Sequence, residues 1–190
     1  MNIYIDFDGT LFDTSKFYND FLNLCKSYNI SESKVYNLRN KSNTLFSLDK
    51  LALDIKNKYN LDESFIGEVN KLYSSKYLYD DVIPFLNKYY KDNNLYILSY
   101  GENNYQLKKI KCCNFTKYFK DIIITTNKGK ENIDYENSLF IDNNPKEIEN
   151  LSKAGATKII RIKRKDDSHF SLICLIPVKE YFALTDIDML

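Results

Sequence analysis

Cysteine, histidine, tryptophan and long apolar runs are scarce or absent in this sequence of 190 residues. Tryptophan is absent, and the single histidine, His169, argues against a histidine-based catalytic triad or a zinc site. The four cysteines form no Cys-x-x-Cys pair, so free thiols in a reducing cytoplasm are expected. No apolar run reaches the roughly 18 residues that a membrane-spanning helix needs. We therefore expect no membrane partner.

An excess of charge of either sign is also missing. The chain has 27 Lys and Arg residues against 26 Asp and Glu residues, which gives a net charge of +1. This balance argues against a protein held to nucleic acid by charge. The hydrophobic content of 44% suits one compact domain, or a core with a small insert. Because the first predicted strand begins at residue 2, we expect no signal peptide and a cytoplasmic location.

Two acidic residues stand at the end of the first apolar strand. Residues 2–7 predict a short buried strand, and Asp6 and Asp8 lie two positions apart near its end. Buried without a cation, two carboxylates repel each other and one is driven to take up a proton. A bound divalent metal removes this repulsion, and Mg²⁺ prefers oxygen ligands and keeps waters that a phosphate can replace. Gly9 then allows a sharp turn of the backbone.

The stretch Asp-Phe-Asp-Gly-Thr-Leu-Phe-Asp at positions 6–13 resembles motif I of the haloacid dehalogenase-like (HAD) hydrolases. That motif is Asp-x-Asp-Gly-Thr or Asp-x-Asp-Gly-Val after an N-terminal strand. The resemblance implies that Asp6 attacks phosphorus and becomes an aspartyl phosphate, while Asp8 serves as general acid and base. A carboxylate nucleophile splits one hard displacement into two easier ones, and a neighbour that gives and takes a proton serves both. Gly9 and Thr10 are expected to contact the phosphate.

A second segment resembles HAD motif II, an apolar strand that ends in Ser or Thr. Residues 94–99 predict such a strand, which ends in Ser99 and is followed by Tyr100 and Gly101. The resemblance implies that the Ser99 hydroxyl and the Tyr100 amide bind the transferring phosphoryl group. The glycine that follows allows an anion to approach the backbone closely.

HAD motif III is a lysine upstream of the last acidic motif, and it neutralises the nucleophile and the phosphoryl oxygens. Lys128 and Lys130 both follow the strand predicted at 121–125. We prefer Lys128, which is nearer to the end of that strand, and keep Lys130 as the alternative. Beside a glycine, two lysines are also ordinary loop residues.

The strand predicted at 138–142 ends in Asp142 and resembles HAD motif IV, which commonly ends in Asp-Asp. The resemblance implies a Mg²⁺ site made by Asp6, Asp142 and the backbone carbonyl of Asp8. Asn143 stands where a second Asp is common. Its amide brings no charge, so we expect it to act through a metal-bound water and the metal to be held more weakly.

Residues 14–77 change to a helical period, with apolar stripes that predict three or four helices packed as a bundle. In HAD proteins an all-helical insert at this point is a C1 cap, which closes over the active site.

The resemblance to HAD proteins also implies an α/β fold. Its Rossmann-like core comprises residues 1–13 and 78–190, with a parallel five-stranded sheet in the order 3-2-1-4-5 flanked by helices. In the insert, Arg39 or Lys41 is either an anion contact or part of a solvated loop.

Together the motifs predict a Mg²⁺-dependent phosphatase for a small phosphomonoester, working as a monomer or small homo-oligomer. A phosphotransferase or phosphomutase would use the same residues. Asn143 and the undecided motif III lysine leave a second hypothesis, a catalytically weak binding or regulatory module with this fold. Asp8 disfavours the dehalogenase branch, where the resemblance implies that this position is not an acid. Residues 165–190 are expected to form an edge strand and a short helix that carry no chemistry.

Overall fold

A computed structural model describes residues 1–40, 45–126 and 133–188 of the chain. Within these ranges it contains a sheet of six parallel strands in the order β3-β2-β1-β4-β5-β6. The predicted order of the first five strands is confirmed. The predicted number of five is wrong, because the C-terminal tail adds a sixth strand at one edge. The strands are β1 (Asn2–Ile5), β2 (Asn94–Tyr100), β3 (Asp121–Thr125), β4 (Ser138–Asp142), β5 (Lys158–Ile162) and β6 (Lys179–Tyr181).

Strand β1 lies inside the sheet, between β2 and β4. Ile5 is in register with Ile97 of β2 and with Ile141 of β4. The Asp6 amide continues this pairing by donating to the Ile141 carbonyl over 2.9 Å. Because the three strands are parallel, the residues that follow them meet at one edge of the sheet. This is the edge at which doubly wound α/β folds hold their ligands.

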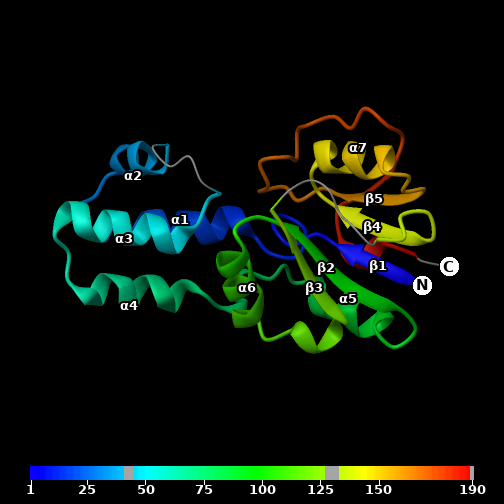
Figure 1. Cartoon of the computed structure of the whole chain (residues 1–190), viewed down its shortest axis with the longest axis horizontal. Helices are drawn as coiled ribbons and strands as arrows, with labels where there is room; N and C mark the ends of the chain where they lie inside the picture. Colours follow the sequence, from blue (N-terminus) through cyan, green and yellow to red (C-terminus); the bar gives the residue numbers. More distant parts are fainter. Residues whose placement is uncertain (41–44, 127–132, 189–190) are drawn as a thin grey trace.

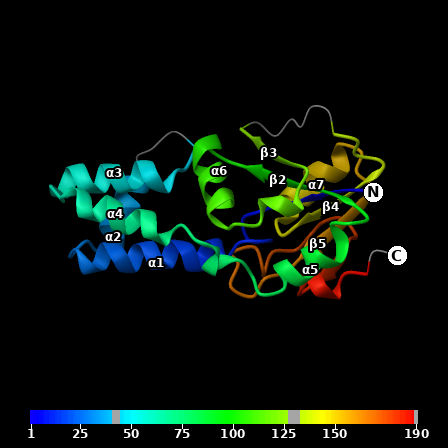
Figure 2. The same ribbon diagram turned by 90° about the horizontal axis from the view of Figure 1, so that it is seen from below.

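Helices cover both faces of the sheet (Figures 1 and 2). One face packs on α5 (Val82–Tyr89) and α6 (Asn103–Cys112), and the other packs on α7 (Pro145–Lys153). Ile3 and Ile5 of β1 are fully buried in the larger apolar core, on the side of α5 and α6. The apolar alternation that predicted the first strand therefore corresponds to a strand held between two helical layers.

Four helices of the described chain lie between β1 and α5 and extend away from the sheet, at the left of Figure 1. Helices α1, α3 and α4 bury apolar stripes of the kind the sequence predicts, as in α1, where Phe17, Phe21 and Cys25 are buried, whereas α2 buries Val35 alone. The number agrees with the three or four helices expected in this insert. The helices are α1 (Thr14–Ser27), α2 (Glu32–Arg39), α3 (Leu48–Tyr59) and α4 (Glu63–Leu72), followed by the 3-10 turn η1 (Ser75–Tyr77).

The C-terminal tail is fixed to the rest of the chain by two buried arginines. The Arg164 guanidinium pairs with both Asp81 oxygens, over 2.7 and 2.9 Å, and donates to the Thr10 carbonyl over 2.9 Å. Arg161 donates to Glu180 of β6 over 2.7 Å. Buried charges need such partners, so these contacts hold β6 and the tail in place. The remaining 3-10 turns are η2 (Thr116–Tyr118) and η3 (Leu184–Asp186).

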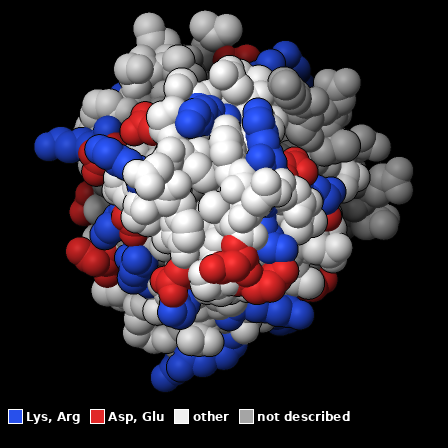
Figure 3. Space-filling model, turned by 90° about the vertical axis from the view of Figure 1, so that its left-hand side faces the viewer, with Lys and Arg blue, Asp and Glu red and all other residues white. Residues whose placement is uncertain are grey.

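The surface and the cysteines agree with the composition. All four cysteines are free thiols, as expected. Figure 3 views the end of the helical insert, where Lys and Arg side chains are interspersed with Asp and Glu. No helix in the described ranges combines the length and the apolar character needed to cross a membrane.

Candidate active site

Three acidic residues of the predicted motifs lie together at the carboxyl edge of the sheet. Asp6 follows β1, Asp142 ends the neighbouring β4, and Asp8 lies in the turn after Asp6. Burial raises the pKa of Asp6 well above its ordinary value, and the carboxylates of Asp142 and then Asp8 raise it further. The Asp6 side chain is therefore close enough to both of the other carboxylates to be repelled by them.

Asp8 is held by donors from two helices. Its carboxylate accepts from the Thr14 hydroxyl of α1 over 2.6 Å. It also accepts from Gln106 Nε2 and Lys109 Nζ of α6, over 2.7 and 2.5 Å. Burial alone would raise the pKa of Asp8, but the Lys109 ammonium and these hydrogen bonds outweigh burial and lower it. Asp8 is thus an anion bound to three donors in this structure.

Lys109 is a buried cation that the sequence analysis missed. Its side chain is 2% exposed, and Nζ lies 4.6, 5.4 and 5.5 Å from the ring centroids of Tyr105, Phe7 and Phe12. Gln106 and Lys109 are three residues apart, so one face of α6 presents both to Asp8. A helical lysine usually keeps its ammonium in water, and no local pattern distinguishes this one from a solvated lysine.

The lysines expected for motif III, Lys128 and Lys130, lie outside the described residues. Lys41 of the insert also lies outside them. In the described part of the chain, Lys109 is the lysine paired with Asp8.

Ser99 ends up at the same edge of the sheet with its hydroxyl buried. It is 2% exposed, and its Oγ has no hydrogen-bond partner among the described residues. A buried hydroxyl without a partner costs folding free energy. A bound ligand that accepts a hydrogen bond from this hydroxyl would explain why it is placed here.

Asn143 follows Asp142 and is buried between the loop after β1 and the loop after β5, with 3% of its surface exposed. Its Nδ2 donates to Asp167 Oδ2 over 2.7 Å, and its Oδ1 accepts from the Thr10 hydroxyl over 3.5 Å. Asp167 also hydrogen-bonds the His169 ring and raises the pKa of that imidazole. Thr10, expected to contact phosphate, is fully buried beside Asn143.

Gly9→Ala is expected to lower the free energy of unfolding by more than about 1 kcal/mol. Gly9 has φ +80°, and an added Cβ would lie 2.2 Å from Asn143 Nδ2 and 3.0 Å from Asp167 Oδ1. Gly155→Ala is the control, because Gly155 has φ +99° but nothing within 4 Å of the added atom. Urea unfolding should show the larger loss for Gly9→Ala. Equal losses would mean that the backbone angle alone explains the glycine.

A cleft of about 800 Å³ opens over Asp8, between the sheet edge, the helical insert and the tail. Residues 165–169 of the tail form part of the cleft wall. The tail was expected to carry no chemistry, and its place beside the cleft does not support that expectation. Four of the predicted residues line the cleft: Asp8, Gly9, Tyr100 and Gly101. Five others are not part of the lining found among the described residues: Asp6, Thr10, Ser99, Asp142 and Asn143.

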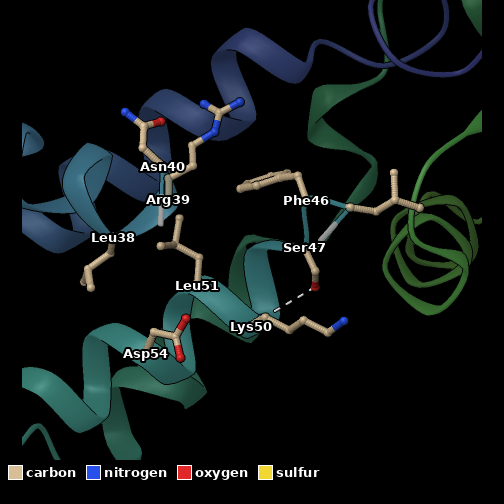
Figure 4. Close-up of a pocket in the computed structure, with 9 residues that line it drawn as sticks. Leu38, Arg39, Asn40, Phe46, Ser47, Lys50, Leu51 and Asp54 are labelled. Atoms are coloured by element: carbon tan, nitrogen blue, oxygen red, sulfur yellow. Dashed lines mark hydrogen bonds between the residues drawn. The ribbon is translucent and has the colours of Figure 1, made fainter. Parts of the chain in front are cut away.

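The helical insert contributes an arginine to the cleft. The Arg39 guanidinium lies over the rings of Tyr18 and Phe46, 5.1 and 4.8 Å from their centroids. Arg39 and Phe46 also line a second cavity of about 440 Å³, which lies between α2 and α3 (Figure 4). Arg39 therefore stands between the two cavities, on the side of the insert that faces Asp8.

The donor set expected for Mg²⁺ is compatible with this geometry. Asp6 and Asp142 offer two carboxylates, whereas the Asp8 carboxylate is engaged by Lys109, so that the Asp8 backbone carbonyl is the atom of this residue that would serve a metal. Among the described residues, no three His, Cys, Asp or Glu side chains are grouped as a metal site. A set of two carboxylates, one carbonyl and waters needs no such group. Burial is the main cause of the raised pKa of Asp6, and repulsion by Asp142 and Asp8 adds to it; a bound cation would relieve that repulsion.

Comparison with known proteins identifies the fold. No protein-family model and no curated protein matches the sequence. A protein of Burkholderia xenovorans LB400, named as a haloacid dehalogenase-like hydrolase, is 12% identical with a TM-score of 0.74, over 97% of this chain and 95% of that chain. YfnB of Bacillus subtilis, named as a HAD-hydrolase and bound to magnesium, is 15% identical with a TM-score of 0.63, over 97% and 95%.

The L-2-haloacid dehalogenase of Xanthobacter autotrophicus, with chloropropionic acid covalently bound, is 14% identical with a TM-score of 0.64, again over 97% and 95%. At such low identity the likeness concerns the fold. It covers nearly the whole chain, the sheet and the helical insert included. The chain therefore has the fold of the haloacid dehalogenase-like hydrolase superfamily.

Proposed function

We propose that this protein is a Mg²⁺-dependent phosphomonoester hydrolase that works through an aspartyl phosphate on Asp6. The observation that carries the proposal is the crowding of Asp6 against Asp142 and Asp8 at the sheet edge, beside a cleft. Strongly shifted carboxylates beside a cleft are typical of functional sites. The hydrolase names of two structurally similar proteins support an enzyme of this fold.

The two motif I acids divide the reaction between them. In the first half, an Asp6 oxygen bonds to phosphorus while the bond between phosphorus and the ester oxygen breaks, and Asp8 gives that oxygen a proton. In the second half, Asp8 takes a proton from water, the water oxygen bonds to phosphorus, and Asp6 is released. Asp8 is held here as an anion by Lys109, so this contact has to loosen before Asp8 can carry a proton.

Magnesium held by Asp6, Asp142 and the Asp8 carbonyl, with Asn143 acting through water, would neutralise the carboxylates and the phosphoryl oxygens. The magnesium bound to YfnB supports this cofactor. Lys109 adds a buried positive charge next to Asp8.

The phosphoryl group is proposed to bind the Ser99 hydroxyl and the Tyr100 amide, with Gly101, Gly9 and Thr10 around it. The hydroxyl without a partner at Ser99 supports this role. The lysines at positions 128 and 130 stay predicted motif III residues.

Ser99→Ala is expected to leave the free energy of unfolding unchanged or to raise it by up to about 1 kcal/mol, because the lost hydroxyl has no partner. If this hydroxyl binds the phosphoryl group, turnover should fall by about 10²-fold. Ser138→Ala is the control, since its buried hydroxyl also lacks a partner in the described chain but stands at the start of β4, away from the site. Urea unfolding and steady-state kinetics measure both effects. Equal turnover in the two variants would contradict the role of Ser99.

The helical insert at 14–77 is proposed to be a C1-type cap on a core of residues 1–13 and 78–190. Its helix α1 supplies Thr14, which donates to Asp8, and its Arg39 lines the same cleft. Arg39 is exposed and lies over Tyr18 and Phe46 at the wall of the cleft, and we propose it as an anion contact of the cap. A cap that closes on a small substrate would exclude water from the phosphoryl group.

The competing readings make different products from the same site. A phosphotransferase or phosphomutase would pass the phosphoryl group to an acceptor other than water, and a dehalogenase would release halide. Asp8 disfavours the dehalogenase hypothesis. A cytoplasmic location is proposed separately, and the free thiols support it.

The proposed function is tested with a panel of small phosphomonoesters in Mg²⁺, including p-nitrophenyl phosphate, with phosphate release as the readout. Release of chloride from 2-chloropropionate is measured in parallel, and Asp6→Asn serves as the blank. Phosphate release that requires Asp6 is the expected result. Chloride release without phosphate release would favour a dehalogenase. No Asp6-dependent product from any compound would favour a binding or regulatory module.

A further inference from the structure

Asp167 lies against the proposed metal site although it comes 24 residues after Asn143. Its Oδ2 accepts from Asn143 Nδ2 over 2.7 Å. Its Oδ1 lies 3.0 Å from the position that a Cβ on Gly9 would occupy. The side chain is 10% exposed. One carboxylate therefore contacts the segment after β4 and packs against the turn after β1.

The Asp167 carboxylate is held in place from several sides. The backbone amide of His169 donates to it over 3.2 Å, and the His169 ring lies 3.3 Å away. Arg161, which is 1% exposed, donates to the carbonyls of His169 and Asn143 over 2.8 and 3.3 Å. The loop after β5 is thus fixed against Asn143, and the carboxylate is preorganised in its position.

The bond to Asp167 also sets the orientation of the Asn143 amide. Because Nδ2 is directed to Asp167, Oδ1 faces the loop after β1, where it accepts the long hydrogen bond from Thr10. In the proposed metal site, this amide oxygen is the atom that would accept a hydrogen bond from a metal-bound water. Residues that orient a metal ligand in this manner commonly change metal affinity when they are replaced.

We propose that Asp167 is a positioning residue of the metal site, and that through Asn143 it supplies the negative charge that Asn143 lacks. This inference rests on the magnesium site of the proposed function. It assigns to the tail the second acid that motif IV would otherwise carry at position 143.

Asp167→Asn is expected to weaken Mg²⁺ binding by about 10-fold or more, measured by calorimetry on the full chain without substrate. Asp166→Asn is the matched control. It removes the same charge one residue away, from an exposed side chain that lines the same cleft. An exposed charge is largely screened, so the Mg²⁺ affinity of Asp166→Asn should stay within about twofold of wild type.

An exchange of the two side chains separates charge from packing. Asn143→Asp alone places two carboxylates at hydrogen-bond distance, so its melting temperature in EDTA should fall and Mg²⁺ should restore it. The double variant Asn143→Asp/Asp167→Asn keeps the net charge. It also allows the hydrogen bond between positions 143 and 167 to form with donor and acceptor exchanged. Its Mg²⁺ affinity should equal or exceed that of wild type.

Each outcome decides the inference. Equal Mg²⁺ affinity in Asp167→Asn and Asp166→Asn would overturn it and leave Asp167 as a contact that only holds the loop. If Asp167→Asn does not fold, the exchange variant decides, because a folded exchange variant with weak Mg²⁺ binding also overturns the inference. A wild type that binds no Mg²⁺ overturns the proposed metal site as well, which distinguishes the two failures.

Discussion

Asp6→Asn should abolish turnover and at the same time raise the melting temperature of the magnesium-free protein. Loss of the nucleophile is expected to lower turnover by at least about 10³-fold. The gain in stability follows because burial and the carboxylates of Asp142 and Asp8 raise the pKa of Asp6. An amide of the same shape removes the repulsion, and each kcal/mol removed raises the melting temperature by about 2–4 °C.

The gain in melting temperature of Asp6→Asn should depend on pH. The folded pKa of Asp6 lies above the unfolded value of 3.8. The favourable contribution of the protonated carboxyl is therefore complete below pH 3.8 and is lost as pH rises through the folded pKa. Thermal unfolding in EDTA should show a difference between Asp6→Asn and wild type that widens from acid to neutral pH. Asp92→Asn, at an exposed acid, should not change the melting temperature. An Asp6→Asn protein no more stable than wild type would mean that the acids are not crowded.

Asp8→Asn should lower both turnover and stability, in contrast to Asp6→Asn. Loss of the general acid and base is expected to lower turnover by about 10²–10⁴-fold. The stability loss follows because Lys109 is 2% exposed and would lose its counter-charge. Leaving a buried charge unpaired costs about 3–5 kcal/mol, and the new amide oxygen keeps the loss near the lower end of that range.

The partner variant Lys109→Met isolates the pair. Asp8 keeps the donors Thr14 and Gln106, so Lys109→Met alone should cost less than Asp8→Asn. The double variant should be more stable than the sum of the two losses predicts, because no charge is then left buried and unpaired. Urea unfolding measures this cycle, and additive losses would contradict the pairing.

The pair of Asp8 and Lys109 also predicts that the free energy of unfolding depends on pH in the acid range. The folded pKa of Asp8 is lowered by Lys109 and by its hydrogen bonds despite burial. The stability it provides is therefore present above the ordinary carboxyl value and is lost as pH falls through the folded pKa. Lys109→Met should flatten this acid dependence.

Local patterns explain how much of the fold the sequence predicts. Each of the first five strands is a short apolar run, and each of the motifs at Asp6, Ser99 and Asp142 follows such a run directly. Parallel pairing then brings the ends of these strands to one edge without further information. An edge strand was expected in the tail, but its position was not predicted, because Lys179–Tyr181 is short and polar. The apolar stretch before it, residues 170–176, forms no strand.

The parts of the site that the sequence does not predict depend on tertiary contacts. Lys109 resembles any solvated helical lysine until Phe7, Phe12 and Tyr105 enclose it. Asp167 reaches Asn143 across the sheet edge, where Arg161 bonds the carbonyls of both Asn143 and His169. The departure at Asn143 was visible in the sequence, but its partner could not be located without the packing of the loop after β5.

Trapping the covalent intermediate tests the central claim most directly. Wild-type protein turning over a phosphomonoester is quenched with borohydride, which reduces an aspartyl phosphate to homoserine, and the modified residue is located by peptide mass spectrometry. The expected result is homoserine at position 6 in wild type and none in Asp6→Asn. Phosphate release with an unmodified Asp6, or with the modification at another acid, would contradict the proposed reaction.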